Sequence, residues 1–154
     1  MASGIAAIVL AAGQSRRMGT PKMVLPWGNT TVIGQVVCTL ASAAVDEIVV
    51  VTGGARLLVE AALERLACDC PVRAVFNPDF AQAEMLSSVQ TGLRSLGEET
   101  GAALIALGDQ PKIQVGVVED LLKIYSQGAR LVVPSYQMRR GHPWVVDSQL
   151  WQEL

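Results

Sequence analysis

Residues 5–22 read IAAIVLAAGQSRRMGTPK, and this stretch decides the fold. It opens with a short, continuous apolar run from Ile5 to Leu10, which is typical of a β-strand buried on both faces. The run ends directly in a loop of small residues that holds two glycines, three cations and no acidic side chain. A strand that passes at once into such a loop predicts the first unit of a parallel α/β sheet.

Four more apolar runs follow along the chain, and each one is stopped by turn residues. They are Ile48 to Val51, Val72 to Phe76, Ala102 to Leu107 and Leu131 to Val133. Segments with helical spacing lie between the runs, namely Val32 to Leu40 and the stripes Leu58-Ala62-Leu66, Met85-Val89-Leu93-Leu96 and Val117-Leu121-Ile124-Tyr125. This alternation predicts an α/β fold with a doubly wound, mostly parallel sheet and right-handed crossovers.

Ligands of such sheets bind beyond the carboxyl ends of the strands. Three candidate loops follow directly after predicted strands: the glycine loop, Asn77-Pro78 and Gly108-Asp109. We therefore expect them to gather at one edge of the sheet and to form the binding site there.

Composition narrows the class of protein. The chain has 154 residues, of which 51% are hydrophobic and 5% aromatic, and this favours a single domain with strands buried on both faces. A formal charge of −2 argues against a general nucleic-acid surface, and the first apolar run is too short to span a membrane. The three cysteines, Cys38, Cys68 and Cys70, lack zinc-finger spacing, so we interpret them as reduced, partly buried thiols of a cytoplasmic protein.

The glycine loop has the composition of an anion-binding site. Successive backbone N–H groups in a small-residue loop can form a concavity for anions, and Arg16, Arg17 and Lys22 can neutralise phosphate oxygens. The spacing of Gly13 and Gly19 matches neither a Walker A loop nor the G-x-G-x-x-G fingerprint. The alternative is a surface turn with solvated cations.

The second motif is Gly108-Asp109-Gln110-Pro111 at the end of a predicted strand. Mg²⁺ prefers oxygen ligands and keeps several waters, so one carboxylate such as Asp109 is enough to hold it. The alternative is a turn in which Asp109 caps the next helix. The spacing alone leaves both interpretations open.

The first motif resembles the signature of the MobA-like nucleotidyltransferases, which is Leu-Ala-Ala-Gly, a Ser, Arg-Met-Gly and then Lys. The resemblance implies a Rossmann-like nucleotidyltransferase fold whose loop wraps a triphosphate. The loop residues that it implies as nucleotide ligands are Leu10, Ala11, Ala12, Gly13, Ser15, Arg17, Met18, Gly19 and Lys22. Guanylyltransferase members usually carry Gly where this chain has Ala12, which is similar to the cytidylyltransferase branch that includes the molybdenum cofactor cytidylyltransferases.

The resemblance extends along the chain. It implies that Asp109 binds the metal, and that Asn77, Ser87 and Ser88 contact the base and ribose, although Glu84 stands where the family commonly has Gly. Without the resemblance, the two serines would be interpreted as part of a polar helix face. The segment Gly141-His142-Pro143 resembles the substrate-side loop that faces a pterin cofactor, whereas a single histidine is more often structural.

Together these residues imply the transfer of CMP from CTP to the phosphate of a molybdopterin-type cofactor, with release of pyrophosphate. Lys22, Arg17 and Asp109 would be catalytic, Mg²⁺ would be the cofactor, and a molybdoenzyme or its chaperone would be a further partner. Family members continue beyond residue 154, so we expect residues 1–154 to be a single domain without its C-terminal part. The alternatives are a guanylyl or sugar-phosphate type of transferase and a non-catalytic nucleotide-binding or cofactor-escort module.

Overall fold

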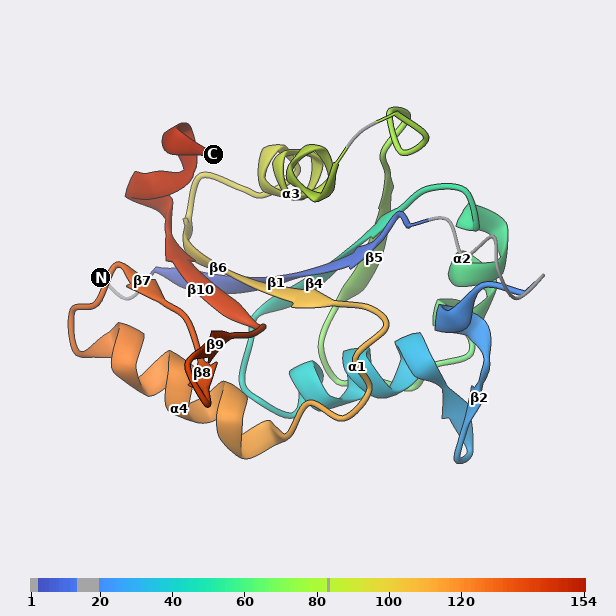
Figure 1. The fold of residues 1–154 in the computed structure, drawn as a ribbon, viewed down its shortest axis with the longest axis horizontal. Coiled ribbons are helices and arrows are strands. Elements are labelled where there is room, and N and C mark those ends of the chain that lie inside the picture. Colours follow the sequence, from blue (N-terminus) through green and yellow to red (C-terminus); the bar gives the residue numbers. More distant parts are fainter. Residues whose placement is uncertain (1–2, 14–19, 83) are drawn as a thin grey trace.

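The computed structural model describes residues 3–13, 20–82 and 84–154, and its centre is a six-stranded sheet (Figure 1). The strand order is β5-β4-β1-β6-β10-β7, and β10 lies antiparallel to both of its neighbours. The strands are β1 (Gly4–Ala11), β4 (Glu47–Thr52), β5 (Val72–Phe76), β6 (Thr100–Leu107), β7 (Leu131–Val132) and β10 (Trp144–Asp147). The α/β fold with a mostly parallel sheet is therefore confirmed.

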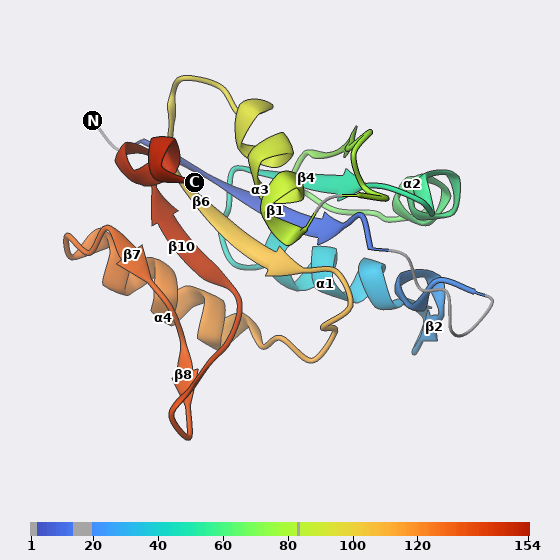
Figure 2. The same cartoon turned by 45° about the horizontal axis from the view of Figure 1, so that its top comes forward.

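Helices cover both faces of the sheet (Figures 1 and 2). On one face the core is built with α1 (Val32–Ala41), α2 (Arg56–Glu64), α4 (Val115–Ser126) and the short 3-10 helix η1 (Lys22–Val24). On the other face lie α3 (Met85–Arg94) and the 3-10 helix η2 (Ser148–Glu153). Two small hairpins project from this body, β2 (Pro26–Trp27) with β3 (Thr30–Thr31), and β8 (Ser135–Tyr136) with β9 (Arg139–Arg140).

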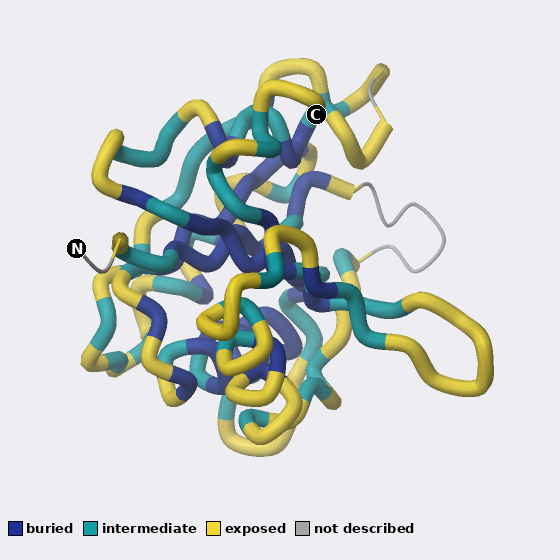
Figure 3. Tube along the Cα trace, turned by 90° about the vertical axis from the view of Figure 1, so that its left-hand side faces the viewer, coloured by how far each residue is buried: buried dark blue, intermediate teal, exposed yellow. Residues whose placement is uncertain are grey.

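The first strand shows why the apolar runs are continuous. Successive side chains of a strand point to opposite faces. Accordingly, Ala7 and Val9 join the core under α1 and α4, whereas Ile8 joins the core under α3. Both faces are buried, so no position along the middle of β1 is left for a polar side chain, and Figure 3 shows this buried centre in dark blue.

Helix α1 follows the N-terminal region as the spacing predicts. The side chain of Thr31 accepts a hydrogen bond from the backbone N–H of Gly34 at 3.1 Å and so caps the first turn. From this cap onwards α1 buries one continuous face against the sheet, which includes Ile33, Val36, Val37 and Leu40.

Parts of the predicted helical stripes are wrong. The buried faces are formed by Val59 and Ala62 in α2 and by Val118 and Leu121 in α4. Four side chains assigned to the core are exposed instead: Leu58, Met85, Val117 and Ile124. In α2 and α4 two or three apolar residues stand side by side in the sequence, so the pattern fits more than one face.

The C-terminal region differs most from the sequence analysis. The strand predicted at Leu131 to Val133 is the sheet edge β7, but β10, which the apolar runs did not predict, lies between it and β6. After β10 the chain forms the 3-10 helix η2, and Asp147 caps it by accepting from the Gln149 N–H at 2.9 Å. Within the described ranges, no helix is both long and apolar enough to cross a bilayer.

Candidate functional site

The loops after β1, β4, β5 and β6 meet at the carboxyl edge of the sheet. These four strands are parallel neighbours, so their last residues lie side by side. Backbone hydrogen bonds continue past the strands: the Gly108 N–H donates to the Leu10 carbonyl at 3.0 Å, and the Asn77 N–H donates to the Thr52 carbonyl at 2.9 Å. The topology thus brings the predicted loops together.

Two glycines allow these loops to come close. A side-chain carbon on Gly108 would lie 2.8 Å from Ile33 Cδ1 and 2.9 Å from the Leu10 carbonyl oxygen. A side-chain carbon on Gly53, after β4, would run into the Ala12 carbonyl oxygen and lie 2.7 Å from Phe80 Cβ. Any larger residue would push the loops apart, which is the close backbone approach that glycine permits.

The glycine loop itself lies only partly within the described residues. Ala11 and Ala12 are buried, Leu10 is half-buried and Gly13 is exposed, which places Gly13 at the surface of the carboxyl edge. The predicted ligands Ser15, Arg17, Met18 and Gly19, together with Arg16, lie outside the described residues.

Lys22 lies two residues after Thr20, the first described residue that follows the loop. It is exposed and begins η1, while its neighbour Met23 is buried in the core. The Met23 sulfur would lie 3.3 Å from a side-chain carbon on Gly108, so η1 packs beside the residue that precedes Asp109. Met23 therefore anchors Lys22 near the end of β6.

Asn77 forms the most connected polar centre of the site. Its side chain is buried, and Nδ2 donates to Ser87 Oγ at 3.0 Å and to Ser88 Oγ at 3.1 Å. Oδ1 accepts from the Asp79 N–H at 3.0 Å. These bonds tie the end of β5 to the first turn of α3, so the structure brings Asn77, Ser87 and Ser88 together. The two serines are therefore part of a polar network and do not form a merely solvated helix face.

Asp109 has a different environment. It is exposed in the turn after β6, where the Gln110 N–H donates to the Leu107 carbonyl at 3.3 Å. The N-cap of α4 is Gln114, so the alternative in which Asp109 caps this helix is wrong. Among the described residues the Asp109 carboxylate has no hydrogen bond or ion pair, and both oxygens are open to a ligand.

His142 approaches this turn from the far side of β6. Trp144 pairs with Ile105 in the antiparallel ladder, so the chain that precedes Trp144 runs towards Leu107 and the Asp109 turn. The His142 ring stacks on the Trp144 indole with centroids 4.7 Å apart and planes 7° apart. Burial lowers the pKa of His142, and the negative charge of Asp109 acts against this shift.

One atom of His142 is unusual. Nε2 is buried and has no hydrogen-bond partner within the part of the chain that the structure describes. Unpaired buried polar atoms are costly in a folded protein. A ligand group that reached this nitrogen would remove that cost, and the binding role of His142 stays a prediction.

The rest of the predicted substrate loop frames His142. The Gly141 N–H donates to the Pro134 carbonyl at 2.9 Å and closes the base of the β8–β9 hairpin. The peptide bond between His142 and Pro143 is cis, and Pro143 is buried. Arg139 and Arg140 are exposed on β9. Gly141, His142 and Pro143 thus lead from the hairpin into β10, next to the Asp109 turn.

The donor set fits a hard, hydrated cation. In the described residues, no group of three or more His, Cys, Asp or Glu side chains comes together as a metal site. Asp109 supplies a single exposed carboxylate, and Mg²⁺ commonly binds through one or two carboxylates while substrate phosphates and water fill the other positions. The site therefore suits a cation that arrives with a nucleotide.

Sequence reasoning missed Trp144 and Gly53. Trp144 orients His142, and Gly53 sets the distance between the loops after β1 and β4. The apolar Trp144-Val145-Val146 run was a usable signal for a strand, because it is short and rich in residues that favour strands. Nothing in the sequence around Gly53 indicated which atoms it would approach.

Known proteins match this chain over nearly its whole length. It is 31% identical over 147 residues to the molybdenum cofactor cytidylyltransferase of Escherichia coli (strain K12), which covers 94% of this chain and 71% of the relative. It is also 31% identical over 154 residues to the nicotine blue oxidoreductase of Paenarthrobacter nicotinovorans, which covers 95% of this chain and 72% of that protein. Two proteins that are named for different activities thus match this chain at the same sequence identity.

Solved structures give the same fold. Rv0371c from Mycobacterium tuberculosis H37Rv superimposes with a TM-score of 0.83 at 28% identity, over 99% of this chain and 76% of that chain. The Rv0371c complex with manganese superimposes with a TM-score of 0.78. Residues 7–154 match the family described as the MobA-like NTP transferase domain. A match of this extent shows that the chain belongs to the MobA-like NTP transferase family.

Proposed function

We propose that this protein transfers CMP from CTP to the phosphate of a molybdopterin-type cofactor and releases pyrophosphate. The observation that carries the proposal is that the Asn77 network after β5, Lys22 in η1 and Asp109 after β6 all lie at the carboxyl edge of the sheet. The relative from Escherichia coli supports this acceptor, and Ala12 in place of Gly supports CTP over GTP.

The residues divide the work between binding and charge neutralisation. Asn77, Ser87 and Ser88 would contact the base and ribose, while Arg17 and the loop N–H groups would hold the β- and γ-phosphates. Lys22 would stabilise the negative charge that develops at the α-phosphate. The reaction needs positioning and electrostatic stabilisation more than covalent chemistry, as phosphoryl transfer generally does.

Asp109 would hold Mg²⁺, which when bound neutralises charge on the phosphate oxygens. An oxygen of the acceptor phosphate forms a bond to the α-phosphorus, and the bond from this phosphorus to the pyrophosphate oxygen breaks. Asp109 needs no role as a general base, because the attacking phosphate is already ionised. Gly141, His142 and Pro143 would face the acceptor, and His142 Nε2 offers a polar contact to it.

Pyrophosphate release tests this function. The protein is incubated with Mg²⁺, molybdopterin-type acceptor and each of CTP, GTP, ATP and UTP in turn, and reactions without acceptor serve as controls. We expect acceptor-dependent release that is fastest with CTP, and CTP binding that is tighter than GTP binding in calorimetry.

Other outcomes would overturn parts of the proposal. A clear preference for GTP would contradict the cytidylyl assignment. Nucleotide binding without pyrophosphate release would favour a nucleotide-binding or escort module. Reduction of a dye substrate without any nucleotidyl transfer would instead favour an activity like that of the relative from Paenarthrobacter nicotinovorans.

A further inference from the structure

A pair of thiols lies outside the proposed site. Cys38 is in α1, and Cys68 is in the connection between α2 and β5. Their sulfur atoms are 4.0 Å apart although the residues are 30 positions apart in the sequence. Both residues are only half-buried.

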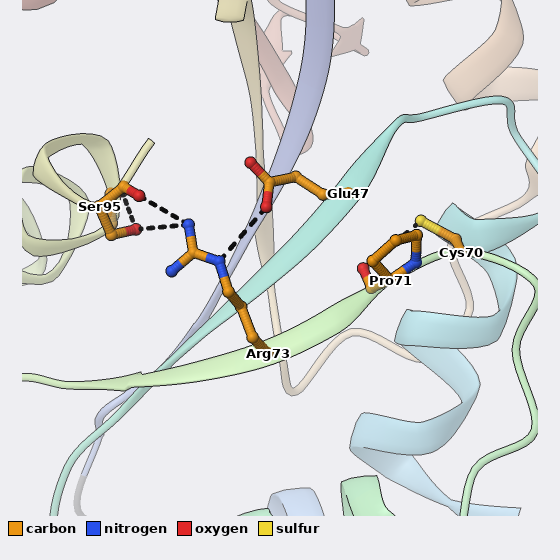
Figure 4. A network of polar contacts seen from close by, with 6 residues as sticks. Glu47, Cys70, Pro71, Arg73 and Ser95 are labelled. Carbon is orange, nitrogen blue, oxygen red and sulfur yellow. Dashed lines mark hydrogen bonds and ion pairs between the residues drawn. The ribbon is translucent and has the colours of Figure 1, made fainter. Parts of the chain in front are cut away.

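The third cysteine does not join this pair. Cys70 Sγ donates to the Val45 carbonyl at 3.5 Å and to the Pro71 carbonyl at 3.6 Å. Figure 4 shows the Cys70 side chain turned towards Pro71 at the start of β5. Within the described residues no group of three or more His, Cys, Asp or Glu side chains comes together, so the close contact is a pair of thiols.

We propose that Cys38 and Cys68 are a site of reversible covalent modification, which a low-molecular-weight disulfide oxidises to an intramolecular bridge. A disulfide has a sulfur–sulfur distance of about 2 Å, so the two atoms must approach by about 2 Å. Rotation of the two half-buried side chains would have to supply this movement. The connection that carries Cys68 already packs against α1, because Leu66 Cδ2 would lie 3.2 Å from a side-chain carbon on Gly34.

The reaction is balanced by the small disulfide. One protein thiolate attacks a sulfur of the reagent and forms a mixed disulfide, and the first small thiol leaves. The sulfur of the second cysteine then attacks the mixed disulfide and releases the second small thiol. The protein loses two protons and two electrons in total, and these reduce the reagent to two thiols.

The surroundings of Cys68 slow its part of this reaction. Burial and, after it, the neighbouring Cys38 raise the pKa of the Cys68 thiol to about 11. Only a thiolate attacks a disulfide, so Cys68 attacks slowly at neutral pH and faster at mildly alkaline pH.

The bridge would connect two parts of the fold that surround β4 and α2. It would join α1 to the connection that leads into β5 and close a loop of about 30 residues. A cross-link of this length restricts the unfolded chain, so we expect the melting temperature to rise by roughly 5–10 °C.

Peptide mapping tests the proposal. The folded protein is treated with glutathione disulfide at mildly alkaline pH, quenched with acid and alkylated. We expect a cross-linked peptide pair that contains Cys38 and Cys68, a mass loss of two hydrogens, the higher melting temperature, and full reversal by dithiothreitol. Cys70→Ser, the matched control, should behave like the natural sequence.

The single variants Cys38→Ser and Cys68→Ser should form no cross-linked peptide pair, carry glutathione adducts only, and show no rise in melting temperature. Circular dichroism of each reduced variant confirms that it is folded. The proposal would be wrong if the unsubstituted protein remained unmodified, carried only glutathione adducts, or formed a bridge through Cys70.

Discussion

The two halves of the carboxyl edge are built in opposite ways. On the β5 side, Asn77 is buried and its side chain makes three hydrogen bonds, to Ser87, Ser88 and the Asp79 N–H. On the β6 side, Asp109 is exposed and His142 Nε2 is buried without a partner in the described residues. The first half is complete without a ligand, whereas the second has polar groups that a ligand would satisfy.

This contrast indicates different roles for the two sides of the edge. A polar network that is already satisfied costs nothing to organise when a ligand arrives, so it is suited to recognising one fixed shape. Groups whose partners are missing are suited to charges that arrive with the substrates. We therefore expect substitutions on the β5 side to affect folding and binding together, and substitution of the exposed Asp109 on the β6 side to affect catalysis alone.

Asp109→Asn should produce the largest effect. The carboxamide keeps the size of the side chain but loses the charge, so Mg²⁺-dependent transfer should fall by about 100-fold or more, equivalent to about 2.7 kcal/mol in the barrier. Activity as a function of Mg²⁺ concentration is the measurement.

Asp109 is exposed and its carboxylate has no hydrogen bond or ion pair among the described residues, so the melting temperature of Asp109→Asn should change little. Asp120→Asn, an exposed aspartate of α4, is the matched control and should retain full activity. Superimposable magnesium curves for Asp109→Asn and the natural protein would remove Asp109 from the metal site.

Asn77→Ala should have the next largest effect and should act on stability. It leaves Ser87 Oγ, Ser88 Oγ and the Asp79 N–H without their partner, and the free energy of unfolding should fall by about 2–3 kcal/mol. Urea denaturation measures this loss, and CTP titration should show weaker binding.

The matched control for Asn77 is Asn29→Ala, in the exposed turn between β2 and β3, which should change stability by less than about 0.5 kcal/mol. If Asn77→Ala were equally harmless, the β5 side would not be the rigid half of the site.

Lys22→Ala should weaken triphosphate binding or turnover by at least about tenfold, which corresponds to a charge-assisted contact of about 1.5–3 kcal/mol. Calorimetry with CTP measures the affinity, and a native circular dichroism spectrum shows that η1 is intact. Lys123→Ala in the last turn of α4 is the matched control. Unchanged binding and rate would favour a surface turn with solvated cations.

His142→Phe should have the smallest effect and should appear in the pH dependence of stability. Burial lowers the pKa of His142 below its ordinary value of 6.5, so the unfolded chain binds this proton at a higher pH than the folded protein does. The contribution of neutral His142 is therefore complete above about pH 6.5 and is lost as the pH falls towards the folded pKa.

Phenylalanine keeps an aromatic ring next to Trp144 but does not titrate, so its stability curve should be flatter between about pH 7 and about pH 5. Urea denaturation in the presence of EDTA measures both proteins without metal. Parallel curves of stability against pH for the two proteins would show that protonation of His142 does not destabilise the folded protein.

The sequence predicted the β1, β4, β5 and β6 strands because a strand buried on both faces needs an unbroken apolar run, as in Ile5 to Leu10. β10 was missed although the Trp144-Val145-Val146 run is a usable strand signal, and its antiparallel place beside β6 depends on tertiary pairing that no local pattern shows. The buried faces of α2 and α4 were misplaced because tertiary packing, rather than periodicity, chose between adjacent apolar residues.

The candidate site shows the same limit. Asn77, Ser87, Ser88, Asp109 and His142 were predicted from motifs, and the structure places them at one edge or beside it. Their hydrogen bonds were not predictable, since the contact between Asn77 and Ser87 depends on how α3 lies against β5. The contact between Cys38 and Cys68 was not predictable either, because nothing in their spacing indicates that they pair.

The position of β10 sets an order of events during synthesis on the ribosome. β7 emerges before β10, yet in the described sheet it pairs only with β10 and has no place until residues 144–147 have emerged. Until then, β6 presents an open apolar edge to other nascent chains. Open edges of this kind are where chains associate wrongly, so this short interval is when a chaperone would protect the protein most.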